Sequence, residues 1–299
     1  MRKIIQLNNV SVGYDERAKI LHDLSFSIQE GDFVGIIGKN GAGKSTLLKS
    51  MRGFLQLAAG EVMLAGRNVQ DYTQRELARK IAYLQQQVEL TFDYTVRDMV
   101  MAGRYPYKKW WQHQDDEDDR IIEACMRYTD VLDMADRPIR ALSGGQRQRV
   151  LLAKVLAQQT PVLFLDEPAA GLDLFYQEEI FRFCRELSSR GKTVVMVVHE
   201  LNLADRYCNR LMLLKGGNVL ADGKPADVLT DELLSAGYGA AIRAVRNEKT
   251  GHADIYTEEL SLTADKKQLL DTIIGISQNT AKLDSLDVQQ RTSKKGGEA

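Results

Sequence analysis

The sequence lacks the features that would place a protein within a membrane or outside a cell. No segment of its 299 residues approaches the run of roughly 18 apolar residues that crosses a bilayer. The first residues, MRKIIQLNNV, contain no continuous apolar stretch of the kind found in secretory signals. The three cysteines, at 125, 184 and 208, form no CxxC pair and are expected to be reduced and buried as small hydrophobic residues. We therefore expect an intracellular protein that reaches a membrane only through partners.

Net charge is also nearly absent. The formal charge of −1 provides no global basic field that would attract nucleic acid or anionic lipid. Hydrophobic content of 44% and charged content of 27% are those of ordinary domains with a sizeable core. At roughly 150 residues per domain, the length allows one large domain or two modest ones.

Short apolar runs alternate with glycine-rich turns, and this pattern predicts an α/β fold. Residues 162–165 and 193–198 have the composition of buried parallel strands, and the helical pattern at 175–191 between them completes a βαβ unit. Residues 76–156 are predicted to be mainly helical, and beyond Arg246 only 266–276 predicts a helix. Further strands are predicted at 4–14, 24–29, 33–37, 61–69 and on both sides of the turn at 216–217.

Residues 38–45, GKNGAGKS, match the phosphate-loop pattern GxxxxGK[ST] between a predicted strand and a predicted helix. The glycines allow successive N–H groups to face one concavity, and the helix N-terminus adds partial positive charge. Lys44 can reach the outer phosphates of a nucleotide, and the Ser45 hydroxyl can ligate Mg²⁺. A glycine-rich turn that merely caps a helix is disfavoured, because strand, spacing, lysine and serine all agree. The predicted phosphate site comprises Gly38, Lys39, Asn40, Gly41, Ala42, Gly43, Lys44, Ser45 and Thr46.

Three predicted strand ends carry reactive groups at the edge where parallel sheets bind ligands. The first leads into the phosphate loop, the second ends at Asp166 and Glu167, and the third ends at His199. Asp166 suits Mg²⁺ on nucleotide phosphates, and Glu167 can orient or deprotonate a water aimed at the γ-phosphate. His199 can donate a hydrogen bond to that phosphate. Alone, the acids would be a solvated turn and the histidine a structural residue, but their place beside the phosphate loop favours function.

The stretch ALSGGQRQR, residues 141–149, combines a helix cap with two glycines. Ser143 and Gln146 have the spacing of a capping box, in which each side chain bonds to the other residue's backbone N–H. An ordinary cap does not explain Gly144 and Gly145, which cost about 1 kcal/mol each in helix stability relative to alanine. Bare amides that a phosphate can approach closely are the expected benefit.

Together these motifs resemble those of the ABC-type ATPases. Residues Leu142–Gln146 are similar to the family's LSGGQ signature, and the other motifs follow in the family's order over residues 10–215. The resemblance implies an α/β P-loop NTPase with a RecA-like mixed sheet core, an antiparallel β subdomain and a helical subdomain at about 87–155, all within residues 1–250. It also implies a head-to-tail homodimer, in which the signature of one chain closes on the ATP and Mg²⁺ held by the phosphate loop of the other.

The same resemblance assigns further site residues. Tyr14 is similar to the aromatic residue that stacks on adenine, and Asp173 to an aspartate at the dimer contact. Gln86 is similar to the glutamine that joins the Mg²⁺ site to the helical subdomain, although the neighbouring Gln85 and Gln87 leave its register open. Ala169 stands where the family often has a hydroxyl residue, so a polar contact across the dimer is expected to be missing.

Residues 95–107 and 199–223 resemble the ATP-binding subunits of iron-siderophore, haem and cobalamin importers. Such importers contain two permease subunits, two ATPase subunits and an external binding protein. The resemblance therefore implies a chain held at the cytoplasmic face of the cell membrane by an integral-membrane permease, and served by the binding protein only indirectly. An importer for another cargo, such as a metal ion, is one alternative. Another is a non-transport ABC protein acting on nucleic acid or ribosomes, which the net charge and the single cassette disfavour.

Two further segments are less specific. In the loop at 108–119, Trp110 and Trp111 are interpreted either as permease anchors or as residues packed on their own subdomain. Asp115–Asp119 favours the positive end of the following helix rather than a metal site shared with His113. Residues 251–299 are expected to form a partly helical extension with a disordered end, packed on the domain or on its dimer mate.

Overall fold

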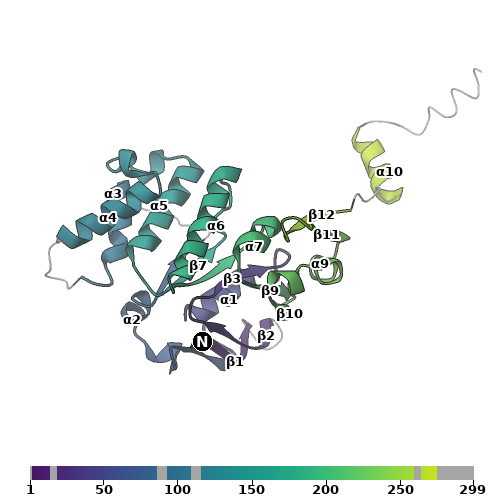
Figure 1. The fold of residues 1–299 in the computed structure, drawn as a ribbon, viewed down its shortest axis with the longest axis horizontal. Helices are drawn as coiled ribbons and strands as arrows, with labels where there is room; N and C mark the ends of the chain where they lie inside the picture. The colour runs from purple at the N-terminus through teal and green to yellow at the C-terminus, as the bar shows by residue number, and fades with distance from the viewer. Residues whose placement is uncertain (1, 14–18, 86–92, 109–115, 259–263, 275–299) are drawn as a thin grey trace, which may run out of the picture. The chain divides into compact units, whose positions relative to one another are not determined.

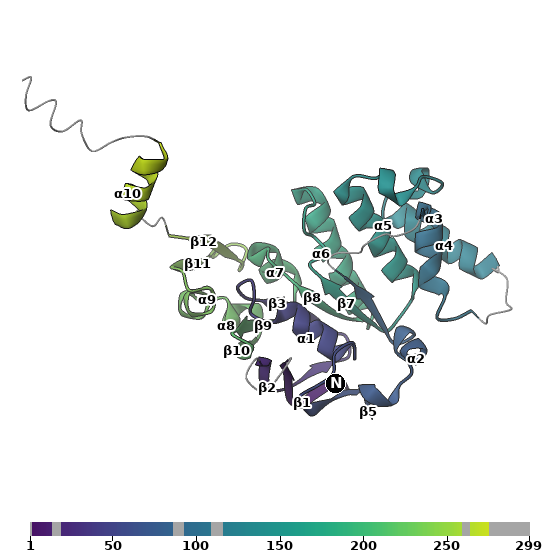
Figure 2. The ribbon, with the colours of Figure 1, turned by 180° about the vertical axis from the view of Figure 1, so that it is seen from behind.

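The computed structural model describes residues 2–13, 19–85, 93–108, 116–258 and 264–274. The chain divides into two compact units, residues 1–257 and 258–299. The first unit contains a six-stranded mixed sheet, a four-stranded antiparallel sheet and a group of helices (Figures 1 and 2). No helix within these ranges is long and apolar enough to cross a membrane.

The six-stranded sheet has the order β10-β9-β3-β8-β7-β6. Its five strands from β9 to β6 run parallel, and β10 pairs antiparallel with β9 at one edge. The parallel strands predicted at 33–37, 162–165 and 193–198 are confirmed, but β6 interrupts a stretch that the pattern predicts to be helical. The strands are β3 (Phe33–Ile37), β6 (Ile81–Leu84), β7 (Val162–Asp166), β8 (Thr193–Val197), β9 (Arg210–Lys215) and β10 (Asn218–Gly223).

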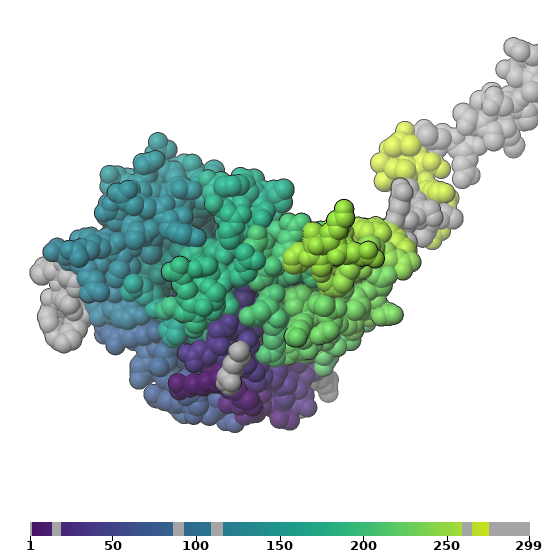
Figure 3. Space-filling view, in the orientation of Figure 1, coloured from purple at the N-terminus to yellow at the C-terminus, as the bar shows by residue number. Residues whose placement is uncertain are grey.

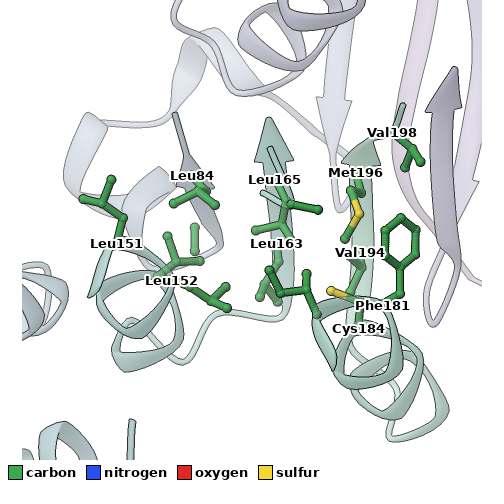
Figure 4. Packing of buried hydrophobic residues seen from close by; sticks show 14 of the residues in the cluster. Leu84, Leu151, Leu152, Leu163, Leu165, Phe181, Cys184, Val194, Met196 and Val198 are labelled. Carbon is green, nitrogen blue, oxygen red and sulfur yellow. The ribbon is translucent and has the colours of Figure 1, made fainter. Parts of the chain in front are cut away.

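Side chains of the parallel strands alternate between two hydrophobic clusters, one on each face of the sheet. Val34 and Phe164 point into the cluster shared with the antiparallel sheet and helix α1 (Lys44–Met51). Phe33 and Leu163 point into the other cluster, where side chains of α5 and α6 meet β6, β7 and β8 (Figure 4). The antiparallel sheet has the order β2-β1-β4-β5 and consists of β1 (Lys3–Gly13), β2 (Lys19–Gln29), β4 (Ala59–Leu64) and β5 (Arg67–Asn68).

Helices α3, α4 and α5 pack together as the helical subdomain, on one side of the first unit (Figure 3, teal). α4 shows the clearest helical spacing, because Ile122 and Met126 are fully buried while its first turn is acidic. Besides α1, the described α-helices before β9 are α2 (Gln74–Ala78), α3 (Val96–Met101), α4 (Asp116–Tyr128), α5 (Gly144–Ala157), α6 (Leu174–Ser189) and α7 (Leu201–Tyr207). Short 3₁₀ turns lie at Val69–Asp71, Ala102–Arg104, Leu132–Met134 and Ile139–Ala141.

The C-terminal part contains elements that the sequence pattern does not predict. Helices α8 (Pro225–Val228) and α9 (Asp231–Tyr238) precede an antiparallel hairpin of β11 (Ile242–Arg246) and β12 (Ala253–Thr257). Because β12 pairs with β11, the first unit runs to Thr257 and includes seven residues expected in the extension. The second unit contains the predicted C-terminal helix, α10 (Ala264–Ile273), whose described apolar side chains are exposed.

Candidate nucleotide site

The phosphate loop joins the end of β3 to the start of α1, and its glycines carry the turn. Gly38, Gly41 and Gly43 have φ of 139°, 81° and 99°, which side chains rarely tolerate. At Gly38 an added Cβ would also lie 2.3 Å from the carbonyl oxygen of Leu214. Gly43 is the N-cap of α1 and no side chain caps this helix, so its first amides remain available to an anion.

Lys44 lies inside the loop, with only 5% of its surface exposed. Its Nζ donates hydrogen bonds to the carbonyl oxygens of Gly38, at 2.7 Å, and Lys39, at 3.2 Å. Burial lowers the pKa of Lys44, while the negative charges of Glu167 and Asp166 oppose that effect. The ammonium group is thus held over the loop, next to two acids.

Asp166, the last residue of β7, is 1% exposed and receives two hydrogen bonds. The Ser45 hydroxyl donates to its Oδ1 at 2.8 Å, and the Tyr83 hydroxyl donates to its Oδ2 at 3.1 Å. Burial raises the pKa of Asp166, and the two hydrogen bonds act in the opposite direction. Tyr83 comes from β6 and is not a residue that the motifs indicate; only the pairing of β6 with β7 brings it to the site.

Glu167 Oε1 and His199 Nε2 lie 2.7 Å apart, within hydrogen-bonding distance. The backbone of Glu167 is left-handed, with φ of 53°, a strained conformation for a non-glycine residue that is typical of functional sites. The hollow beside the phosphate loop is lined by Ile20, Asn40, Gly41, Gly43, Lys44, Ser45, Thr46, Glu167 and His199. The structure therefore brings together the ends of β3, β7 and β8, which carry the phosphate loop, Glu167 and His199, respectively.

The signature segment lies at the N-terminus of α5, where Ser143 and Gly144 are exposed and Leu142 is buried. The capping box is present: Ser143 N donates to Gln146 Oε1 at 2.9 Å, and Gln146 N donates to Ser143 Oγ at 3.3 Å. An added Cβ at Gly144 would meet no atom within 4 Å, so its backbone is open to an approaching group. Among the described residues that line the hollow, none comes from α5.

The other predicted site residues either lie away from the residues that line the hollow or fall outside the described ranges. Asp173 is the N-cap of α6, and its Oδ1 accepts a hydrogen bond from Tyr176 N at 3.1 Å. Gln85 is exposed and follows β6 directly. The remaining predicted residues, Tyr14, Gln86, Gln87, Trp110, Trp111 and His113, lie outside the described residues.

The oxygen donors at the site suit Mg²⁺ on a nucleotide. Ser45 and Asp166 offer a hydroxyl and a carboxylate 2.8 Å apart, which are ligands that Mg²⁺ accepts. Within the described ranges, no group of three or more His, Cys, Asp or Glu side chains could hold a metal ion. The residues present therefore fit an ion to which the protein contributes two oxygen ligands.

Comparison with known proteins places this geometry in a family. The family model described as ABC transporter matches residues 21–170. The chain is 42% identical over 232 residues to the hemin import ATP-binding protein of Rhodococcus jostii, covering 78% of this chain and 79% of that one. It is 37% identical over 257 residues to the iron(3+)-hydroxamate import ATP-binding protein of Bacillus subtilis, covering 86% of this chain and 95% of that one.

Solved structures show the same architecture. A metal-chelate type ABC transporter in an inward-facing conformation matches with a TM-score of 0.70 and 25% identity, covering 89% of this chain and all of that chain. The dimeric bacterial ABC transporter cassette MJ0796 matches with a TM-score of 0.67 and 31% identity, covering 74% of this chain and 99% of that one. The mixed sheet core with an antiparallel sheet and helices is thus the ABC cassette fold.

Proposed function

This chain belongs to the ABC transporter ATP-binding proteins, and on that premise we propose that it is the ATP-hydrolysing subunit of an importer for an iron-siderophore complex, haem or cobalamin. The observation that carries the proposal is the hollow lined by the phosphate loop, Glu167 and His199, in which Ser45 is bonded to Asp166. The relatives named for iron(3+)-hydroxamate and hemin import support an iron complex as the cargo.

The phosphates of ATP are bound by the loop. The loop of residues 38–46 and the Lys44 ammonium surround the position of the outer phosphates, and the loop amides that have no partner within the protein would donate to them. Ser45 and Asp166, with Gln86 as assigned by the motif, would hold Mg²⁺, which neutralises developing phosphate charge when bound. Tyr14 would stack on the adenine, as its place in the motif order suggests.

For hydrolysis we assign Glu167 and His199, which follow β7 and β8. Glu167 orients a water toward the γ-phosphorus; as the water oxygen bonds to phosphorus, the bond to the ADP oxygen breaks and the carboxylate accepts the water proton. His199 Nε2, 2.7 Å from Glu167 Oε1, holds that carboxylate in place; with ATP bound, the histidine would instead donate to the γ-phosphate. The left-handed backbone at Glu167 turns its side chain into the hollow beside Lys44.

A second copy completes the site. In the signature, Ser143 and Gly144 are exposed, and no signature residue lines the hollow of its own chain, so we assign the segment to the γ-phosphate bound by a partner copy. Asp173 then lies at the same contact. The dimeric form of the related cassette supports this arrangement. Permease subunits would hold the pair at the cytoplasmic face of the membrane, with the external binding protein contacting only the permease.

Replacing Glu167 with glutamine tests the proposed function. E167Q keeps the shape of the site but removes the proton acceptor, so phosphate release should fall by on the order of 100-fold or more while ATP binding persists. The ATP-bound dimer should accumulate, which light scattering after size exclusion would measure. E186Q, which alters an exposed acid paired with Arg190 on α6, is the matched control. Undiminished phosphate release from E167Q would reject the assignment.

A further inference from the structure

The first amide of the phosphate loop is bonded to a residue 200 positions further along the chain. Gly38 N donates a hydrogen bond of 3.1 Å to the hydroxyl oxygen of Tyr238, at the end of α9. Gly38 is buried, so this N–H has no bulk water to replace a lost partner. Burial also raises the pKa of Tyr238, which keeps the hydroxyl neutral at physiological pH.

Close packing of α9 on the sheet delivers Tyr238 to that position. At Gly237 an added Cβ would lie 2.9 Å from Leu213 Cδ1, so the absence of a side chain lets α9 lie directly on β9. Leu213 is the β9 residue paired with Ile37, the last residue of β3. A helix seated on Leu213 therefore places its next residue, Tyr238, over the point where β3 becomes the phosphate loop.

Helix α9 and the hairpin β11–β12 form one hydrogen-bonded body, here called the C-terminal module (residues 231–257). The Asp231 carboxylate accepts from the Ala244 amide at 2.7 Å and from the Arg243 guanidinium at 2.8 Å. The Ser235 hydroxyl oxygen accepts from the Ile242 amide at 3.0 Å. These bonds fix the hairpin to both turns of α9.

The C-terminal module also bonds to the helix that follows His199. The amide of Ala253 donates to Asp205 Oδ2, and the amide of Ile255 donates to Asn202 Oδ1, each at 2.9 Å. Both acceptors are on α7, which begins two residues after His199. The module therefore touches the phosphate loop through Tyr238 and the histidine strand end through α7.

We propose that Tyr238 is a positioning residue of the ATP site. Its hydroxyl fixes the first amide of the phosphate loop, and the C-terminal module holds that hydroxyl at a set distance from the His199 segment. The inference rests on the proposed function, because it concerns how tightly the same site binds phosphates. Tyr238 does not line the hollow itself, so its effect on ATP is transmitted through the loop.

The test compares Tyr238→Phe with Tyr107→Phe. Tyr107 is also half-buried and also bonds to a backbone group, donating to the carbonyl oxygen of Gln158 at 2.8 Å, but it lies in the helical subdomain. In Y238F the Gly38 amide loses its acceptor. We expect the Kd for a non-hydrolysable ATP analogue to rise about 3- to 10-fold, and KM to rise in parallel, while kcat stays within about twofold. Y107F should bind as the wild type does.

Hydrogen exchange provides a second measurement, and its first part uses only the wild-type protein, so it does not depend on whether a variant folds. The Gly38 amide should exchange much more slowly than that of exposed Gly41, and Y238F should remove this protection. Equal exchange at the two glycines, an unchanged Kd in Y238F, or an equal loss in both variants would overturn the inference alone. Failure of the wild-type protein to bind ATP would overturn the proposed function and this inference together.

Discussion

Asp166 carries its charge where only 1% of its surface meets solvent. Hydrogen bonds from Ser45 and Tyr83 favour the ionised carboxylate, yet burial outweighs them and the pKa rises above its ordinary value near 3.8. A raised pKa means that the folded protein binds this proton more readily than the unfolded chain does. Stability from this group is thus present at low pH and is lost as pH rises through the folded pKa.

Replacing Asp166 with asparagine should therefore stabilise the nucleotide-free protein while disabling it. At pH 7 the melting temperature of D166N should rise by about 2–4 °C, because a buried charge is removed and the shape is kept. The difference from wild type should shrink as pH falls through the raised pKa of the Asp166 carboxyl. Mg²⁺-dependent ATP binding should be lost. A melting temperature below that of wild type at pH 7 would show that the charge stabilises the fold.

Sequence motifs predict the residues whose chemistry defines the site but not those that support them. Lys44, Ser45 and Asp166 follow from a loop pattern and a strand end, which are local features. Tyr83 and Tyr238 belong to no motif, because their roles depend on which strand pairs with β7 and on which helix lies on β9. Tyr83 and its partner Asp166 are separated by 83 positions in the sequence, and Tyr238 and its partner Gly38 by 200. Local sequence periodicity cannot predict such contacts.

Among the elements, the start of α5 could be predicted from sequence. The capping box at Ser143 forms as its spacing predicts, since it needs only local groups. Strand β6 was not predicted, because its four residues are too few to show a strand-like alternation of apolar and polar residues within a region of helical pattern. The hairpin β11–β12 was not predicted for another reason. Only one face packs on the protein, while Arg243, Val245 and their neighbours are exposed, so the sequence of this segment is largely polar.

The contact between α3 and α5 offers a test at this scale. Gly103, in the 3₁₀ turn after α3, is buried, and an added Cβ would lie 2.3 Å from the carbonyl oxygen of Lys154. Gly103→Ala should force the helices apart, costing about 1–3 kcal/mol and lowering the melting temperature by roughly 3–10 °C. Gly223→Ala is the control, because its Cβ would meet its nearest atom only at 3.7 Å. Equal melting of the two variants in a circular dichroism scan would refute the tight contact.

At the scale of the whole molecule, the arrangement of the site is consistent with the proposed dimer. The hollow holds the phosphate loop, Glu167 and His199, whereas the exposed signature at Ser143 lies elsewhere on the same chain. Leu174 and Phe175, just after Asp173, are 74% and 65% exposed, which is unusual for such apolar side chains. These features are accounted for when two copies meet, each contributing the part that the other lacks. Sequence alone predicts this only through the family resemblance, because one chain contains no pattern that describes its mate.

Mixing two inactive variants tests that arrangement. Lys44→Ala should disable the phosphate loop but leave the signature intact, and Ser143→Arg should do the reverse. In a symmetric two-site dimer, random pairing makes about half of the dimers mixed, and each mixed dimer contains one intact site and one doubly damaged site. Phosphate release should therefore recover to roughly a quarter of the wild-type rate at equal total protein, and dilution below the dimer Kd should abolish it. Sites built from a single chain predict no recovery at any ratio, so a mixture as inactive as its components would rule out sharing.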